Sequence, residues 1–386
     1  MSARRPIVAI AFVTVFLLFL ATACGGGGGG TLGVKSERVA AADRAAAMAI
    51  APDGRLFFGE QVTGAIRVVS ADGVLQEEPF AQLEVATYVD LDWGLTGLAL
   101  DPDFEMNHYL YAFLTEPVEP DTPVARPVVV RFTDRDSEGV DREVIVNDLP
   151  ETLPATPGFN ANGNIHFGPD GFLYLSLGDY DAPPLVQNLS MPIGKLLRVD
   201  KDNGSPAPGN PLADDPDADP RIYAYGFREP FDFAFHPEAG AIYGSDNTTV
   251  SCEEINLIEP GANYGWPDVG EFPYSDCGAG EGKNAIHLLA HEGTQPGDFL
   301  SFVEVSGLAF ASAGVYPLLG DSLLVCESQT MLLRRLVLGG PDLDQVTADD
   351  IVAEDCRFDV EVSPDGTIYY SNADEIRRLA PTSEGP

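Results

Sequence analysis

Short runs of alternating apolar and polar residues, paired around a tight turn, recur along this 386-residue chain. Residues 48–58 read Met-Ala-Ile-Ala-Pro-Asp-Gly-Arg-Leu-Phe-Phe, and residues 165–175 and 360–370 repeat this pattern around further Pro-Asp-Gly turns. Period-two runs on both sides of such a turn predict β-hairpins, because proline presets the φ angle of a turn and glycine supplies a positive φ. More divergent copies occupy the ranges 98–113, 233–243 and 308–325.

Six hairpins over residues 32–386 give about 59 residues per unit, which is the spacing of propeller blades with inserted loops. A unit of this kind cannot bury both faces alone, so the copies must stack around an axis. We expect third strands at 65–69, 128–132, 195–199 and 332–338. The pattern therefore predicts an all-β fold, a six-bladed β-propeller over residues 41–382. A pair of β-sandwiches and a β-helix are the alternatives, and the regular hairpin spacing disfavours both.

The first residues have the pattern of an export signal. Arg4 and Arg5 precede an apolar run at 7–20, and a small-residue cleavage site of the A-x-A form covers residues 21–23. Cys24 and six glycines follow, which resembles a bacterial lipoprotein signal. We expect residues 1–23 to be the signal peptide, Cys24 to carry lipid, and residues 24–40 to form a Gly-rich tether.

Two alternatives to the lipoprotein signal remain, an ordinary secretory signal and a single retained membrane span. All three interpretations place the body of the protein outside the cytoplasm. The lipoprotein interpretation places it in the bacterial cell envelope, lipid-anchored to a membrane on the periplasmic or extracellular side.

Four cysteines lie in the body of the chain. An even number in an exported protein suggests two disulfides, and four cysteines allow three pairings. We favour Cys252–Cys277 and Cys326–Cys356 because each closes a fairly local loop. The chain has no CxxC motif and no Cys/His spacing typical of zinc sites.

The chain is strongly acidic, with 22 Lys and Arg against 60 Asp and Glu and a formal net charge of −38. This charge excludes a general nucleic-acid binder, which needs clustered cations against phosphate. It also disfavours docking on anionic lipid, so the expected membrane contact is the lipid anchor alone. The acidic run at 214–220 is interpreted as a solvated loop or, as an alternative, a calcium site without EF-hand spacing.

Five segments resemble signatures of the glucose/sorbosone dehydrogenase family, which are soluble quinoproteins that oxidise aldoses with pyrroloquinoline quinone (PQQ). The segments are 94–104, 163–179, 194–200, 222–230 and 253–267. The resemblance covers roughly residues 45–380 in the right order. It implies the same propeller, a small sugar or glycan as ligand, oxidation at C1 of the sugar, and PQQ and calcium as cofactors.

The resemblance also assigns the site residues. The catalytic His of the family aligns with Asn160, and an amide cannot act as a base near neutral pH. Cofactor-binding positions align with Asp92, Arg228 and Gln329, of which Arg228 alone keeps the cation of the family. A family Arg aligns with Phe358; Arg357 is adjacent and would face the other way on a strand. No residue is assigned to a metal.

Two neighbouring features bear on the same site. The Asn that follows the family Arg is Glu229 here, which places an anion beside a cofactor that carries three carboxylates. Among the histidines, His166 lies inside a strand and is interpreted as structural, while His287 and His291 lie in a long loop that could reach the central funnel.

Two functions follow from these residues. The first is an exported aldose dehydrogenase that uses the quinone. The second is a catalytically degenerate propeller of the same family that binds a sugar, a glycan or an envelope protein. Overall similarity favours the first, and the residue chemistry favours the second, so the sequence leaves the enzymatic status open.

Overall fold

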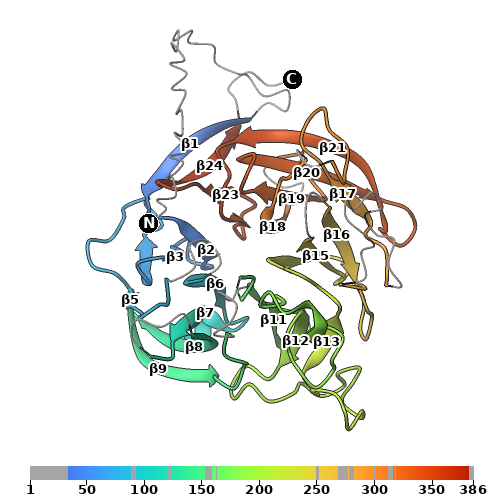
Figure 1. The fold of residues 1–386 in the computed structure, drawn as a ribbon. Coiled ribbons are helices and arrows are strands. Elements are labelled where there is room, and N and C mark those ends of the chain that lie inside the picture. The colour runs from blue at the N-terminus through green and yellow to red at the C-terminus, as the bar shows by residue number, and fades with distance from the viewer. Residues whose placement is uncertain are drawn as a thin grey trace, which may run out of the picture.

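The computed structural model describes residues 34–87, 93–119, 124–152, 159–161, 163–248, 252–267, 277, 282–298, 301–311, 316–317 and 319–381. These residues form six four-stranded antiparallel sheets that surround a central axis (Figure 1). The six-bladed β-propeller predicted from the hairpin pattern is therefore confirmed. The helical segments in these ranges are α1 (Phe104–Asn107) and a 3-10 turn (Pro183–Leu185), and neither is long and apolar enough to cross a membrane.

Each sheet is one blade, and five of the six take their strands in chain order from the axis outward. Blade 1 consists of β2 (Ala45–Ile50), β3 (Leu56–Glu60), β4 (Ala65–Val69) and β5 (Ala81–Gln82). Blades 2 and 3 consist of β6 (Leu95–Leu100), β7 (Tyr109–Pro117), β8 (Ala125–Arg135) and β9 (Glu138–Val146), and of β10 (Ile165–Phe167), β11 (Leu173–Leu177), β12 (Lys195–Val199) and β13 (Ile222–Tyr225).

The second half of the ring follows the same order, and blade 6 takes its outermost strand from the start of the chain. Blades 4 and 5 consist of β14 (Phe233–Phe235), β15 (Ile242–Asn247), β16 (Glu253–Ile258) and β17 (His287–Leu289), and of β18 (Val305–Ala311), β19 (Ser322–Glu327), β20 (Leu332–Gly339) and β21 (Gln345–Glu354). Blade 6 consists of β22 (Val360–Val362), β23 (Ile368–Ser371), β24 (Glu375–Pro381) and β1 (Val34–Ala41).

The Pro-Asp-Gly turns join the innermost strand of a blade to its second strand. In blade 1 the Gly54 N–H donates to the Ala51 carbonyl at 2.9 Å, and the Ala51 N–H donates to the Arg55 carbonyl at 2.8 Å. Gly54 has a φ of 87°, a conformation that glycine alone adopts at little cost. The turn residues therefore fix the hairpin register that the apolar alternation requires.

The divergent hairpins and the third strands also form as predicted. The most divergent copy, at 308–325, gives β18 and β19, with Leu308 opposite Val325. The predicted third strands correspond to β4, β8, β12 and β20. The repeat was therefore readable even where the Pro-Asp-Gly string is lost, because the period-two alternation persists.

Buried side chains gather between neighbouring blades. Within the described ranges, six clusters of buried hydrophobic residues occupy the six junctions of the ring. Phe57 and Leu110 pack between blades 1 and 2, and Tyr243 and Leu323 pack between blades 4 and 5. Each buried side chain of this size contributes about 1.5–3 kcal/mol of stability.

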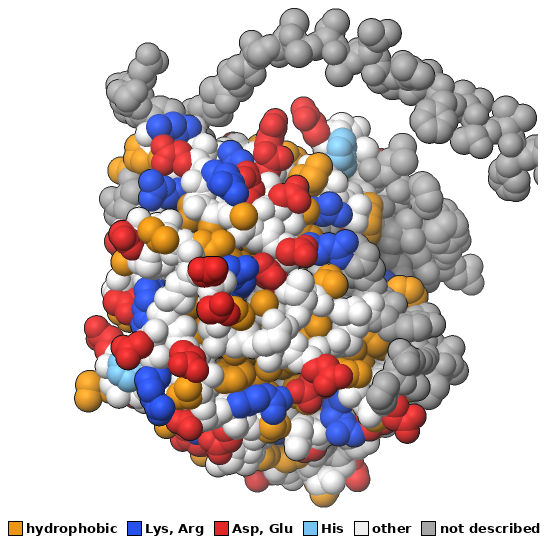
Figure 2. All heavy atoms as spheres, turned by 90° about the vertical axis from the view of Figure 1, so that its left-hand side faces the viewer, with side chains coloured by type: hydrophobic (Ala, Val, Ile, Leu, Met, Phe, Trp, Pro, Cys, Tyr) orange, Lys and Arg blue, Asp and Glu red, His pale blue; other side chains and the backbone are white. Residues whose placement is uncertain are grey.

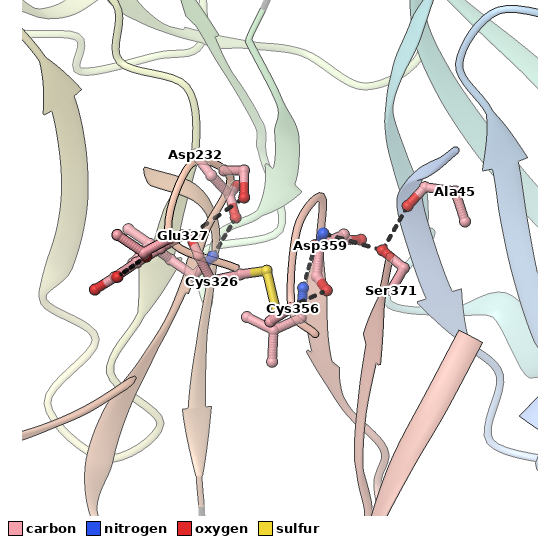
Figure 3. Close-up of a disulfide and its surroundings, with 11 residues drawn as sticks. Ala45, Asp232, Cys326, Glu327, Cys356, Asp359 and Ser371 are labelled. Atoms are coloured by element: carbon pink, nitrogen blue, oxygen red, sulfur yellow. Dashed lines mark hydrogen bonds between the residues drawn. A yellow bond between two sulfur atoms is a disulfide. The ribbon is translucent and has the colours of Figure 1, made fainter. Parts of the chain in front are cut away.

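The N-terminal strand closes the ring. β1 pairs antiparallel with β24, beginning with Val34 opposite Pro381, so blade 6 combines both ends of the described chain. Residues 34–40, which the sequence analysis gave to the tether, thus belong to the propeller, where they cover an otherwise unpaired edge of β24. On the inner side, the Ser371 hydroxyl donates to the Ala45 carbonyl at 2.7 Å and joins blade 6 to blade 1 (Figure 3). The predicted signal and Cys24 lie outside the described residues.

Both predicted disulfides are present. Cys252 is bonded to Cys277, and Cys326 is bonded to Cys356. Cys326 lies in β19 and Cys356 lies just before β22, so the second bridge joins blade 5 to blade 6 (Figure 3). Both of these residues are 0% exposed within the core shared by the two blades.

Charged side chains of both signs mix on the side of the ring shown in Figure 2. Arg142 lies 2.5 Å from a carboxylate oxygen of Glu116, and Arg38 lies 2.7 Å from one of Glu375. Exposed pairs of this kind contribute about 0–1 kcal/mol each. On this side the acidic excess is interspersed with cations and forms no single anionic patch.

Candidate functional site

The two ends of the propeller axis carry different parts of each blade. The innermost strands begin, and the second strands end, at one end of the ring, which we call the funnel face; the Pro-Asp-Gly turns lie at the other end. Asn160, Arg228 and Arg357 each precede an innermost strand, and Gln329 follows a second strand. The fold therefore brings these four residues to the funnel face. Asp92 lies outside the described residues.

Asn160 is buried and holds a carboxylate. Its side-chain amide donates to Asp179 Oδ1 at 2.8 Å, and Trp266 Nε1 donates to Asp179 Oδ2 at 2.9 Å. The Asp179 N–H donates to the Arg228 carbonyl at 2.7 Å, which connects two of the predicted site residues. Burial raises the pKa of Asp179, while the hydrogen bond from Asn160 and the charge of Arg228 oppose that rise. Asn160 thus holds the carboxyl group of Asp179 in place, and its own amide is not a base that could take a proton from a substrate.

Carboxylates enclose Arg228. Its Nη1 donates to the Asn247 carbonyl at 2.6 Å and lies 3.5 Å from Glu229 Oε2. The backbone N–H groups of Arg228 and Glu229 donate to Asp246 at 3.0 and 2.7 Å. Burial acts to lower the pKa of Arg228, but the charges of Glu229 and its neighbours outweigh burial and raise it. The one family cation at this site is therefore already paired within the chain.

Glu253 adds a fully buried acid near Arg228. Neither of its carboxyl oxygens has a hydrogen-bond partner in the described part of the chain. Burial, followed by repulsion from Glu304, raises the pKa of Glu253 well above its usual range. Burial also raises the pKa of Asp246 to about 7. Sequence reasoning missed these acids, because the 253–267 signature marks the segment without showing how deeply its side chains are buried.

The remaining predicted residues meet at blades 5 and 6. Gln329 Nε2 donates to Glu304 Oε2 at 2.5 Å. Arg357, Phe358 and Glu304 line a cavity of about 20 Å³, which holds about one water molecule. Residues 357–359 precede β22 and lie outside any strand, so strand alternation does not separate Arg357 from Phe358. The two side chains line the same cavity.

The histidines lie elsewhere. His287 Nε2 is 3.1 Å from Asp349 Oδ2, a pair that links the outer strands β17 and β21 away from the axis. His166 Nε2 is 2.7 Å from Asp232 Oδ1, and Asp232 Oδ2 accepts the Leu308 N–H at 2.6 Å. This network joins blades 3, 4 and 5, in agreement with a structural role for His166.

The described residues do not fit a cofactor that carries three carboxylates. Such a ligand needs several unpaired cations in its pocket. Arg228 is already engaged by Asn247 and Glu229, and the position of the family Lys holds Gln329, whose amide is bonded to Glu304. Arg357, whose Nε has no hydrogen-bond partner in the described part of the chain, is the one further cation among the predicted residues. The described residues also contain no group of three or more His, Cys, Asp or Glu side chains able to hold a metal ion. Calcium therefore stays an expectation from the resemblance.

Comparison with known proteins gives a consistent family. The model of the family described as Glucose / Sorbosone dehydrogenase matches residues 42–380. An aldose sugar dehydrogenase of Escherichia coli is 26% identical over 297 residues, which cover 75% of this chain and 77% of that protein. The quinoprotein glucose dehydrogenase B of Acinetobacter calcoaceticus is 29% identical over 273 residues, which cover 63% of this chain and 55% of the relative. The chain thus spans only about half the length of that relative.

A solved structure shares the fold over almost the whole chain. An oxidoreductase of Thermus thermophilus, described as a glucose dehydrogenase, superposes with a TM-score of 0.74 at 30% identity, covering 90% of this chain and 100% of that one. The two chains therefore share the propeller fold.

Proposed function

The chain belongs to the glucose/sorbosone dehydrogenase family, and we propose that it is an exported member that binds a sugar or glycan without oxidising it. The observation that carries the proposal is Asn160, whose amide donates to Asp179 where the resemblance places the catalytic His. Oxidation at C1 needs a base that takes the hydroxyl proton as hydride leaves. The two oxygens of Asp179 accept hydrogen bonds from Asn160 and Trp266, which hold this buried acid in place.

The electrostatics of the funnel face support the same proposal. Glu229, Asp246 and Glu253 lie around Arg228, so a tricarboxylate cofactor would meet anions or buried neutral acids beside that cation. A neutral sugar carries no such penalty, and its hydroxyl groups can donate to carboxylate and amide oxygens. Similarity favours the dehydrogenase, and the retained Arg228 and the neighbouring Arg357 are the described site residues on its side.

Export is part of the proposal. The two disulfides persist in oxidising compartments and are rare in the cytosol. Together with Cys24 and the glycine run, they support a lipid-anchored protein of the cell envelope. Metabolic labelling with palmitate tests the anchor: we expect label on the wild-type protein and none on Cys24→Ser. Equal labelling of the two proteins would contradict the anchor and leave the rest of the proposal standing.

Reconstitution tests the loss of oxidation. The purified chain is incubated with excess PQQ and calcium, and aldose-dependent dye reduction is measured against the Escherichia coli relative as the positive control. We expect no activity. A single Asn160→His variant should stay inactive, because Glu229 and Gln329 still replace the Asn and the Lys of the family. The triple variant Asn160→His, Glu229→Asn, Gln329→Lys restores the base and one cation and should gain measurable turnover.

Two results would contradict the proposal. Dye reduction by the wild-type chain, dependent on both quinone and aldose, would show that the site is catalytic despite Asn160. Dye reduction that is lost in Arg228→Ala and kept in the exposed control Ala239→Ser would locate that activity at the funnel face.

A further inference from the structure

A polar cavity lies on the outer edge of the ring, where blades 2 and 3 meet. Its volume is about 880 Å³, against about 20 Å³ for the cavity beside Arg357. Four segments line it: the residues that follow β9, the loop at 188–190, the turn at 203–206 and the acidic segment at 216–221. Ligand sites in proteins have volumes of about 300–1,000 Å³, so this cavity has the size of a binding site.

The walls of this outer cavity are fixed by contacts within the chain. Arg221 forms a two-pronged pair with Asp219, with Nε 3.0 Å from Oδ1 and Nη2 2.7 Å from Oδ2, and its Nη1 donates to Asp148 at 2.6 Å. The Asp219 N–H donates to the Leu189 carbonyl at 2.8 Å, which connects the acidic segment to the loop at 188–190. The cavity is therefore preformed and needs no ordering before it binds a ligand.

A glycine brings the two blades together at the cavity. A Cβ atom on Gly204 would lie 2.4 Å from the Ile145 carbonyl oxygen, so the turn of blade 3 packs directly against the end of β9. Gly204 also has a φ of 69°, which a larger side chain adopts only with strain. This close approach joins the wall of one blade to the wall of the next and gives the cavity a defined shape.

Uncharged polar side chains dominate the free groups of the lining. These are the amides of Asn147, Asn188 and Asn203 and the hydroxyl of Ser205, while the Ser190 hydroxyl donates to Asn188 Oδ1 at 2.9 Å. The amide nitrogens of Asn188 and Asn203 have no acceptor in the described part of the chain, because the bonds that these residues form use their oxygens. Each can donate to a ligand oxygen.

Charge limits what the outer cavity accepts. Asp148, Asp217 and Asp219 face one cation, Arg221, which is already paired with two of them. The excess of carboxylates disfavours phosphates, carboxylates and acidic sugars. The polar lining equally disfavours an apolar ligand, whose burial would leave amides and carboxylates without partners. A neutral ligand rich in hydroxyl groups satisfies both conditions.

We propose that the outer cavity binds a neutral carbohydrate chain, at a site separate from the funnel face. Hydroxyl groups of the sugars donate to the carboxylates of Asp148 and Asp217 and accept from the amides of Asn147, Asn188 and Asn203. Proline rings at 206, 216 and 220 supply flat apolar surface for the C–H faces of the sugar rings. The volume accommodates more than one ring, so the ligand is an oligosaccharide segment of a longer chain.

Isothermal titration of the mature chain with neutral oligosaccharides tests this site. Cello-, malto-, xylo- and chitopentaose are the probes, and we expect saturable binding of at least one. Asn147→Ala, which removes an amide without a hydrogen bond to described residues, should weaken that binding about tenfold, the effect of about one hydrogen bond. Ser205→Trp should abolish it by filling the cavity. Ala239→Trp, on an exposed turn of blade 4, is the matched control and should bind normally. Thermal melts confirm that each variant folds.

Three results would overturn the proposal. The first is no saturable binding of any probe up to millimolar concentration. The second is binding that Asn147→Ala and Ser205→Trp leave unchanged, which would place the sugar elsewhere. The third is heat of binding on titration with calcium, but with none of the sugars, that is lost in the Asp217→Asn variant; this would show that the cavity is a calcium site. Quinone-dependent activity would contradict the proposed function and leave this site untouched, so the two failures are distinguishable.

Discussion

Removing the disulfide between Cys326 and Cys356 should lower the stability of the whole ring. The bond closes a loop with a sequence separation of 30 residues and joins blades 5 and 6. A loop of this length corresponds to about 3.6 kcal/mol of lost chain entropy in the unfolded state at 25 °C. Both sulfurs lie in the core between the two blades, so their loss acts on the junction that holds these blades together.

The expected shift in melting temperature follows from the size of the propeller. Unfolding entropy is about 2.1 cal/mol/K per residue near 60 °C, which gives about 0.7 kcal/mol/K for residues 34–381. A loss of about 3.6 kcal/mol then lowers the melting temperature by about 5 °C. The double variant Cys326→Ala, Cys356→Ala should show this shift by calorimetry. A reducing agent applied to the wild-type protein should produce a shift of the same sign.

The other disulfide provides the control. Cys252–Cys277 closes a loop of nearly the same length, with a separation of 25 residues, but Cys277 is half-buried and both cysteines lie between β15 and β17 of blade 4. The matched variant Cys252→Ala, Cys277→Ala loses nearly the same chain entropy, about 3.5 kcal/mol. A larger shift in the first variant therefore measures the packing lost between blades 5 and 6. An unchanged melting temperature in the first variant, or a larger shift in the second, would refute the view that the bridge between blades 5 and 6 stabilises the ring.

Three further predictions concern the buried acids. Burial raises the folded pKa of Asp246 to about 7 and of Glu254 to about 8. An acid whose pKa is higher in the folded state than in the unfolded state stabilises the fold fully below the unfolded pKa, and this stability is lost as pH rises through the folded pKa. The melting temperature should therefore fall from pH 5 to pH 8. A melting temperature that stays constant over this range would contradict the prediction. Glu253→Gln should raise the melting temperature by a few degrees at pH 8 and leave it unchanged at pH 5, as differential scanning fluorimetry can measure. Asp232→Ala should cost about 2–4 kcal/mol in urea unfolding, because the Leu308 N–H loses its acceptor in the ring interior; a loss below about 1 kcal/mol would show that this bond matters little.

The architecture was predictable because one local pattern repeats. A turn glycine such as Gly54 and the alternation around it define a hairpin without reference to the rest of the chain. Six copies then require a ring, and the cysteine spacing predicted which pairs form. β1 was missed at 34–40, because its partner β24 lies at the other end of the sequence and six glycines just before it drew the segment into the tether.

The candidate site was predictable only in part. Alignment of motifs gave Asn160, Arg228 and Gln329 as site residues, and the strand order brings all three to the funnel face, while their role there stays a prediction. Their partners were not predictable, because Asp179 and Glu253 meet these residues only after the blades pack, and burial sets their protonation. The outer cavity was likewise invisible to the sequence, which showed its acidic segment at 214–220 as a solvated run and gave no sign of the neighbouring amides.

Absorbance titration of the mature chain with PQQ tests the central claim most directly, because it measures occupancy of the funnel face before any chemistry. The account predicts that the quinone spectrum stays that of the free compound up to about 100 µM, with calcium present, and that added glucose changes nothing. A stoichiometric spectral shift, followed by reduction of the bound quinone when glucose is added, would contradict it.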